Sequence, residues 1–273
     1  MRGSLLIIAV LLVIAVRADD GTVMQACPEP SPETLPVSLQ ASTYDRSAAF
    51  ISVDMLVSGA FTGKAVDVRT ADDRRRVPLP GMLELGLVEL RTMVGHGAES
   101  FAVIGTGYDD DRLARRIAAW SESSSRVRIV SGGAAAWLAA KGGRVDRNRL
   151  RAGIGVPVTR VSEVANRPGW QLASLGPEAY TKLEHWLVDV SVQELTGVEA
   201  AKEFFEGVKA GDISGLLLVS NDGRQSADAA VMLSREFGHP VYYVEGGAEA
   251  FERHMSRFAS INREPGVARG SCQ

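Results

Sequence analysis

The segment that decides the fold is Leu216–Ala230, which reads LLLVSNDGRQSADAA. It begins with an apolar run of the length of a short buried strand, continues through the polar turn 221–225 and enters a helix near Ser226. A strand, a tight turn and a helix start bring several backbone N–H groups around one point, where an anion or a thiolate is stabilised. The segment therefore indicates an α/β protein with a candidate anion-binding loop at the end of a strand.

The same order of elements occurs earlier in the chain, which indicates two copies of one domain. Each copy has a buried strand, a loop, an amphipathic helix, a further strand and a glycine-rich turn that opens another helix. Corresponding positions, such as Gly105 and Ser220 or Gly132 and Gly246, are separated by about 115 residues. Short apolar strands alternating with helices predict, in each copy, a parallel sheet covered by helices on both faces.

Individual elements follow from the local patterns. In the first copy we expect strands at 50–53, 65–69, 101–105 and 127–130, and helices at 54–58, at 112–121 and after 132. In the second copy we expect strands at 186–191, 216–220 and 241–244, and helices at 227–237 and after 246. The segment 186–191, WLVDVS, is interpreted as the counterpart of AVDVR at 65–69.

The ends of the chain indicate export. Arg2, the apolar run Leu5–Val16 and the small-residue pattern ending at Ala18 have the layout of a secretory signal peptide. The apolar run is shorter than the roughly 20 residues that cross a bilayer, although an uncleaved anchor is the alternative. The predicted localisation is periplasmic or secreted, with no membrane span after cleavage. The predicted organisation is a signal peptide at 1–18, an extended lead-in at 19–45, domain one at 46–144, a linker at 145–170, domain two at 171–258 and a tail at 259–273.

Charge and metal-ligand spacing exclude several classes of function. The net charge is −3 and both signs are interspersed, which is not typical of a protein that binds nucleic acid. The basic run Arg74–Arg76 follows Asp72 and Asp73, so we interpret it as a solvated loop face. The histidines are scattered without the spacing of a metal site or a catalytic pair, and we expect no metal and no cofactor.

The two cysteines, Cys27 and Cys272, lie near opposite ends of the chain. In an exported protein such a pair predicts a disulfide that joins the two ends. The alternative is that both are tail thiols with no role in the fold.

These motifs resemble the tandem form of the rhodanese-like family. The family's marks are a strand with an aspartate near its end, a six-residue loop that opens on a cysteine, and a Gly-Gly-x-x-x-Trp turn. The aspartate mark is matched at 66–69 and 188–191, and the glycine turn at 132–137 and, with Phe251 in place of tryptophan, at 246–251. The resemblance covers about residues 45–258 and implies two tandem rhodanese-like domains. It also implies that Asp67 and Asp189 are structural residues near the loops.

The resemblance implies that the catalytic cysteine position is degenerate in both copies. In the second copy it falls on Ser220, and the loop continues through Asn221, Asp222, Gly223, Arg224, Gln225 and Ser226. We expect the Ser220 hydroxyl to satisfy a backbone group. In the first copy the position falls on Gly105, and the loop exits through Asp109–Asp111, which we expect to cap the next helix and to repel an anion. No catalytic residue is assigned.

Two hypotheses of function follow. The first is a non-catalytic binding or scaffolding module, linked to sulfur or redox metabolism, whose partner is a protein or a small oxyanion. Sulfur transfer needs a thiolate, and a serine hydroxyl cannot replace it. The alternative is a thiosulfate-type sulfurtransferase or sulfur carrier that uses a non-standard thiol such as Cys272.

Overall fold

The computed structural model describes residues 46–261, apart from 121–124, 142–143 and 210–214. The predicted signal peptide, the lead-in at 19–45 and the Cys27–Cys272 pair lie outside the described residues, as does the tail beyond 261. Within the described part, no helix combines the length and the apolar character needed to cross a membrane.

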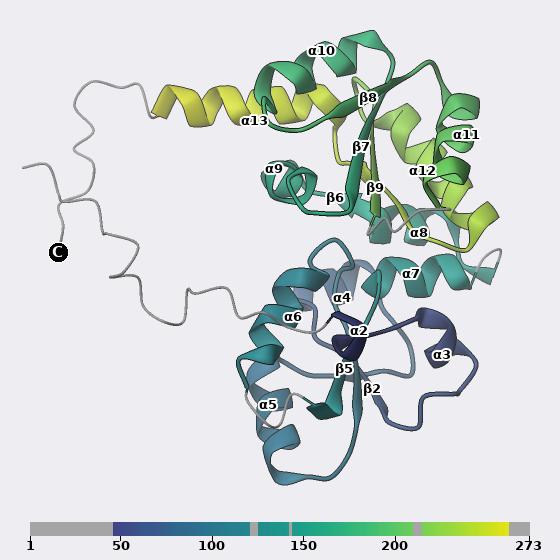
Figure 1. The fold of residues 1–273 in the computed structure, drawn as a ribbon, viewed down its shortest axis with the longest axis vertical. Helices are drawn as coiled ribbons and strands as arrows, with labels where there is room; N and C mark the ends of the chain where they lie inside the picture. The colour runs from purple at the N-terminus through teal and green to yellow at the C-terminus, as the bar shows by residue number, and fades with distance from the viewer. Residues whose placement is uncertain (1–45, 121–124, 142–143, 210–214, 262–273) are drawn as a thin grey trace, which may run out of the picture. The chain divides into compact units, whose positions relative to one another are not determined.

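The first half of the described chain folds around a five-stranded parallel sheet ordered β1-β5-β4-β2-β3 (Figure 1). Its strands are β1 Phe50–Ile51, β2 Lys64–Asp67, β3 Leu83–Glu84, β4 Phe101–Ile104 and β5 Val127–Val130. Its helices are α2 Arg46–Ala49, α3 Val53–Val57, α4 Ala71–Arg76, α5 Leu87–His96, α6 Asp110–Ala118 and α7 Gly133–Ala140.

The second half forms another five-stranded parallel sheet, ordered β6-β10-β9-β7-β8. Its strands are β6 Gly155–Val156, β7 Trp170–Leu175, β8 Val192–Leu195, β9 Gly215–Val219 and β10 Val241–Val244. Its helices are α8 Arg147–Ile154, the 3₁₀ turn η6 Val158–Arg160, α9 Val161–Ala165, α10 Pro177–Trp186, α11 Val198–Lys209, α12 Arg224–Phe237 and α13 Gly247–Ile261. In Figure 1, α11 and α12 lie on one side of this sheet and α9 lies on the other.

The two sheets have the same strand order when β1 is matched to β6 and each later strand to its successor. The prediction of an α/β protein with two copies of one parallel-sheet domain is therefore confirmed. Regular elements also fill the range 145–170 that was predicted as a linker, because α8, β6, η6 and α9 lie there and β6 is an edge strand of the second sheet.

The central strands show that both faces of the first sheet are covered. Along β4, Phe101 and Val103 belong to one hydrophobic cluster, whereas Ala102 and Ile104 belong to another. Because successive side chains of a strand point to opposite faces, each face of β4 has its own core. In the second sheet, all five residues of β9 are buried, as expected for a parallel strand between two helical layers.

One predicted strand is wrong. Residues 187–191 form turns rather than a strand, and Val188 is 84% exposed. The counterpart of β2 is β7, in which Ser174 pairs with Val219 as Asp67 pairs with Ile104. Ser174 is buried and its Oγ has no hydrogen-bond partner among the described residues. The second copy therefore has a serine where the first has its structural aspartate, and Asp189 does not hold that place.

The two copies share a core. The larger hydrophobic cluster contains residues of both sheets, including Ile104 of β4 and Leu218 of β9. Tyr242 of β10 is buried, and its hydroxyl donates a hydrogen bond to the carbonyl of Gly132 in the first copy at 3.4 Å. Its ring also meets that of Tyr108 edge to face, with 6.5 Å between centroids. The loops of the first sheet are thus packed against a strand of the second.

Candidate functional site

The loop that follows β9 begins with Ser220, whose side chain is buried. Its Oγ accepts the backbone N–H of Ser226 at 3.1 Å and donates to the Ser226 Oγ at 3.1 Å. The Ser226 hydroxyl in turn donates to the Gly223 carbonyl at 3.3 Å. The Ser220 hydroxyl is therefore engaged inside the loop. Among the described residues, no histidine, lysine or carboxylate is hydrogen-bonded to it.

The start of α13 fixes this loop from one side. The backbone N–H of Ala248 donates to the carbonyl of Ser220 at 3.0 Å. The close approach requires glycine at Gly247, whose φ is +66° and where a Cβ would overlap the backbone nitrogen of Gly223. The glycine-rich turn therefore holds the loop in place by direct backbone contact.

The remaining charged groups of this loop face solvent. The Arg224 side chain is 86% exposed, and its Nε lies 3.6 Å from the Asp222 carboxylate. The backbone N–H of Arg224 donates to Asp222 Oδ1 at 2.9 Å, and Gln225 is exposed. The N–H groups of Arg224 and Ser226 already donate within the loop, so these two donors are engaged. Anion binding by residues 220–226 stays a prediction.

Asn221 links the loop to two helices. Its Oδ1 accepts a hydrogen bond from Lys182 Nζ at 2.8 Å, and its Nδ2 donates to Glu249 Oε1 at 2.9 Å. Lys182 also lies 3.6 Å from the carboxylate of Glu252. Lys182, which contacts the loop, is thus also engaged with a carboxylate of α13.

The corresponding loop of the first copy begins at Gly105, directly after β4. A Cβ at this position would lie 3.1 Å from Leu113 Cδ2 and 3.4 Å from Asp110 Oδ1. The Leu113 side chain therefore leaves little room for a side chain at position 105, and the Asp110 carboxyl lies at contact distance. Asp110 is buried, its Oδ2 accepts the N–H of Gly132 at 2.7 Å, and its Oδ1 has no hydrogen-bond partner in the described part of the chain. Burial raises the pKa of the Asp110 carboxyl well above its usual range.

Asp109 stands at the N-cap position of α6, but its side chain makes no capping hydrogen bond. The expected cap is therefore wrong for this residue. Its carboxylate instead accepts hydrogen bonds from Arg160 at 2.8 Å and from Arg167 at 3.4 Å. With Asp109 paired to arginines and Asp110 buried, neither of these two carboxylates is an exposed, unpaired charge at the exit of the loop.

A cavity of about 440 Å³ lies beside this loop. Its walls come from the ends of β2 and β4, from α4, α5 and α6, and from the segment that follows β6 in the second copy. The lining residues are Val68, Arg69, Thr70, Asp73, Leu87, Gly105, Thr106, Tyr108, Asp109, Arg112, Leu113, Arg116, Pro157, Thr159 and Arg160. Because ligands of parallel sheets bind at the carboxyl ends of the strands, this cavity is the second candidate site.

Two arginines of this cavity were missed at the sequence level. Arg112 and Arg116 lie one turn apart on α6, both are exposed, and both line the cavity. Leu113 and Ile117 form the apolar face of this helix, whereas the amphipathic pattern alone assigns no role to its polar face. An arginine pair at i and i+4 directly after a loop was the signal that could have found it.

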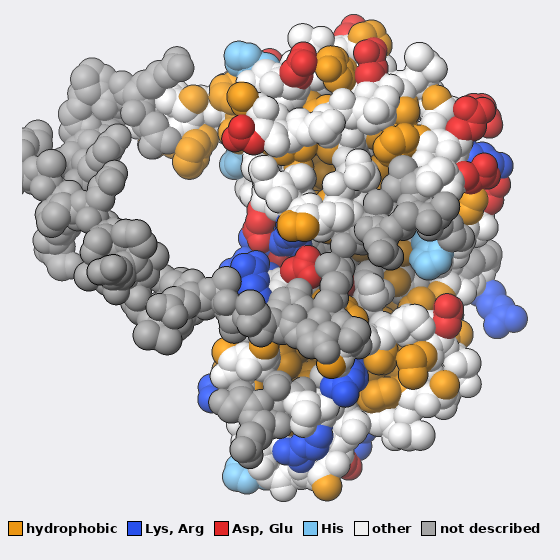
Figure 2. Space-filling model, viewed as in Figure 1, with side chains coloured by type: hydrophobic (Ala, Val, Ile, Leu, Met, Phe, Trp, Pro, Cys, Tyr) orange, Lys and Arg blue, Asp and Glu red, His pale blue; other side chains and the backbone are white. Residues whose placement is uncertain are grey.

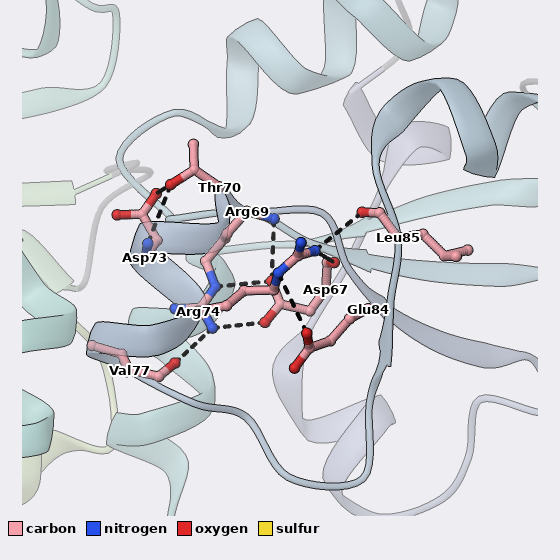
Figure 3. A network of polar contacts seen from close by, with 8 residues as sticks. All are labelled: Asp67, Arg69, Thr70, Asp73, Arg74, Val77, Glu84 and Leu85. Carbon is pink, nitrogen blue, oxygen red and sulfur yellow. Dashed lines mark hydrogen bonds and ion pairs between the residues drawn. The ribbon is translucent and has the colours of Figure 1, made fainter.

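One wall of the cavity is held by a buried ion pair. Arg69 donates to the Asp67 carboxylate from Nε at 2.9 Å and from Nη2 at 2.7 Å, and both side chains are almost fully buried. Figure 3 shows the Arg69 guanidinium also reaching the carbonyl of Val77, at 2.7 Å. The pair connects the end of β2 to the end of α4 and so fixes the segment 68–70 that lines the cavity.

The basic run at 74–76 belongs to α4 rather than to a solvated loop. Arg74 donates to the carbonyl of Asp67 at 3.2 Å (Figure 3), and Arg76 forms an ion pair with Glu245 of the second copy. Only Arg75, paired with Asp72, is mainly solvated. On the face drawn in Figure 2, side chains of both charges alternate with hydrophobic ones, without an extended basic surface.

Aromatic residues of the two glycine turns take part in packing. Phe251 is fully buried, and Trp137 is partly buried against the same core, with Lys141 Nζ 4.3 Å from its ring centroid. In the described part of the chain, no group of three or more His, Cys, Asp or Glu side chains is placed to hold a metal ion.

Comparisons with known proteins give loose structural likeness. No protein-family model and no curated protein matches the sequence. Similar solved structures include a thiosulfate sulfurtransferase from Pseudomonas aeruginosa, at 17% identity and a TM-score of 0.30, over 75% of this chain and 44% of that one. The 3-mercaptopyruvate sulfotransferase SseA of Escherichia coli matches at 14% identity and a TM-score of 0.24, over 73% of this chain and 98% of that one. YnjE matches at 15% identity and a TM-score of 0.26, over 79% of this chain and 59% of that one. This chain thus spans less than half of the Pseudomonas enzyme.

Proposed function

We propose that this chain is an exported rhodanese-like protein that binds a partner or a small anion and does not transfer sulfur. The observation that carries the proposal is the state of the two nucleophile positions. In one copy the position is Gly105, and in the other it is a serine whose Oγ is hydrogen-bonded twice to Ser226.

The chemistry of sulfur transfer supports this proposal. A thiolate attacks the outer sulfur of a donor such as thiosulfate, forms a persulfide and releases sulfite. A serine hydroxyl forms no persulfide, and it needs an adjacent base to act as a nucleophile at all. Ser220 has no such base among its hydrogen-bond partners in the described residues.

Sulfur transfer from thiosulfate to cyanide by the purified mature protein tests the proposal. We expect no thiocyanate above background from the wild-type chain. Turnover by the wild-type chain would overturn the proposal, and its loss in Cys272→Ala would assign the reaction to the tail thiol, which lies outside the described residues.

A matched pair of variants adds a positive arm. Ser220→Cys places a thiol beside the N–H of Ser226 and is expected to accept one sulfur atom, read as a mass increase. Ser234→Cys is the control. Ser234 lies in α12 and is buried like Ser220, but it is hydrogen-bonded to Val241 and not to the loop. Sulfur on both variants or on neither would show that the loop does not activate a thiol.

Export and the disulfide form part of the same proposal. Mass spectrometry of the secreted protein should show an N-terminus at Asp19 and, without reduction, a mass two hydrogens lower than that of the reduced chain. A retained leader, or two free thiols, would contradict these parts of the proposal.

A further inference from the structure

We infer that the cavity beside the first-copy loop binds a small organic phosphate monoester, whose dianionic head is held by Arg112 and Arg116. The inference rests on the proposed binding function and gives it a site and a class of ligand. The cavity of about 440 Å³ lies within the range of roughly 300–1,000 Å³ that small-molecule sites occupy. It lies at the carboxyl end of a parallel sheet, where such sites are common.

Two arginines of the cavity are already engaged in ion pairs, and two others are not. Arg69 is held by Asp67, and Arg160 lies 2.8 Å from both Asp109 and Glu163. Arg112 and Arg116 have no ion pair or hydrogen bond with any other described residue. Two guanidinium groups one helical turn apart therefore face this cavity with their charge uncompensated.

The carboxylates on the lining do not cancel that charge. Asp109 is shared by Arg160 and Arg167. Asp73 accepts the hydroxyl of Thr70 at 2.6 Å within the first turn of α4. If Asp73 is counted as ionised, its single negative charge offsets only one of the two positive charges of Arg112 and Arg116. The cavity therefore keeps one net positive charge and favours an anion.

The presence of two guanidinium groups favours a phosphate monoester over a carboxylate. A planar guanidinium donates two parallel hydrogen bonds to an oxyanion, and two such groups match the two negative charges of a phosphate monoester. A single carboxylate would leave one of the two cations without a partner.

The rest of the lining suits an organic body. Val68, Leu87, Leu113 and Pro157 give the cavity an apolar wall. Thr106 and Tyr108 also line the cavity, and their hydroxyl groups give its wall polar atoms for a ligand.

Calorimetric titration of the mature chain with phenyl phosphate tests the inference, with inorganic phosphate, benzoate and phenol as comparison ligands. We expect phenyl phosphate to bind more tightly than each of the other three, with an affinity that falls as salt rises. Arg112→Gln and Arg116→Gln should each weaken binding about tenfold, and the double variant more. Arg115→Gln is the matched control, because Arg115 is exposed on the same helix but does not line the cavity.

The outcomes separate this inference from the proposed function. Absence of phenyl phosphate binding at millimolar concentration, or equal weakening in Arg115→Gln, overturns the site. Benzoate binding as tightly as phenyl phosphate overturns the assignment to phosphate. The sulfur-transfer assay is independent of both results, so failure of one leaves the other to be judged separately. Circular dichroism and thermal unfolding of each variant exclude loss of folding as the cause.

Discussion

The Asp110 carboxylate lies 3.4 Å from the point where a side chain at Gly105 would begin, and Leu113 lies 3.1 Å from the same point. The first-copy loop therefore has little room for a side chain at position 105, because Leu113 Cδ2 lies at this short distance.

Gly105→Ala should lower the free energy of unfolding by about 1–3 kcal/mol, since the added methyl group would lie 3.1 Å from Leu113 Cδ2 and overpack against it. Gly95→Ala is the control, because Gly95 lies in α5 with nothing within 4 Å of a Cβ. That change should instead stabilise by about 0.5–1 kcal/mol. Urea unfolding of both variants measures the difference, and equal effects at the two positions would contradict the packing argument.

Asp110→Asn should stabilise the protein at neutral pH and have little effect in acid. Burial raises the pKa of Asp110 in the folded state, so the native protein binds this proton more tightly than the unfolded chain does. The associated stability is present below the unfolded pKa of about 4 and is lost as pH rises through the folded value. Each unit of the shift corresponds to about 1.4 kcal/mol. Urea unfolding from pH 4 to pH 8 should show a growing advantage for Asp110→Asn, whereas a constant difference would contradict the burial argument.

Asp67→Ala should destabilise by about 3–5 kcal/mol, because it leaves the Arg69 guanidinium buried without its carboxylate. The exposed pair Arg75–Asp72 provides the control, and Asp72→Ala should change stability by no more than about 0.5 kcal/mol. The double variant Asp67→Leu, Arg69→Met should recover part of the loss. If the double variant is as unstable as Asp67→Ala, the unpaired charge is not the cause.

Gly247→Ala and Gly238→Ala separate backbone strain from collision. Their φ values are +66° and +65°, so an L side chain strains the backbone alike at both, by about 1–2 kcal/mol. Only at Gly247 would a Cβ meet the backbone of the Ser220 loop. Gly247→Ala should therefore lose more than Gly238→Ala, by about 1–3 kcal/mol. Similar losses at both positions would show that the loop moves away at no cost.

The sheet architecture could be predicted because its signals are local. Short apolar runs such as 101–104 and 216–219 are buried on both faces, and the glycine turns recur at a constant separation. The counterpart of β2 could not be predicted in the same way. The segment 186–191 imitates the VDVR pattern, whereas β7 has Ser174 in place of the aspartate. Pairing with β9, a long-range contact, decides between them.

The candidate sites also combine features that local sequence patterns indicate with features that only long-range contacts decide. The resemblance to the rhodanese-like family places the two nucleophile positions at Ser220 and Gly105, and this assignment stays a prediction. The ion pairs of Asp109 with Arg160 and Arg167 join residues more than fifty positions apart, and no local pattern indicates them. The cavity follows from these long-range contacts, so the uncommitted state of Arg112 and Arg116 is visible only in three dimensions.

The hydrogen bond from Tyr242 to the Gly132 carbonyl has a consequence for how this protein evolves. Each half of the described chain supplies part of the other's interior. A protein made of one half alone would therefore expose a tyrosine or part of an apolar core. Recombination that exchanges one half for a distant relative would break the same contacts. Substitutions in the loop around Gly132 are therefore constrained by a strand of the other half.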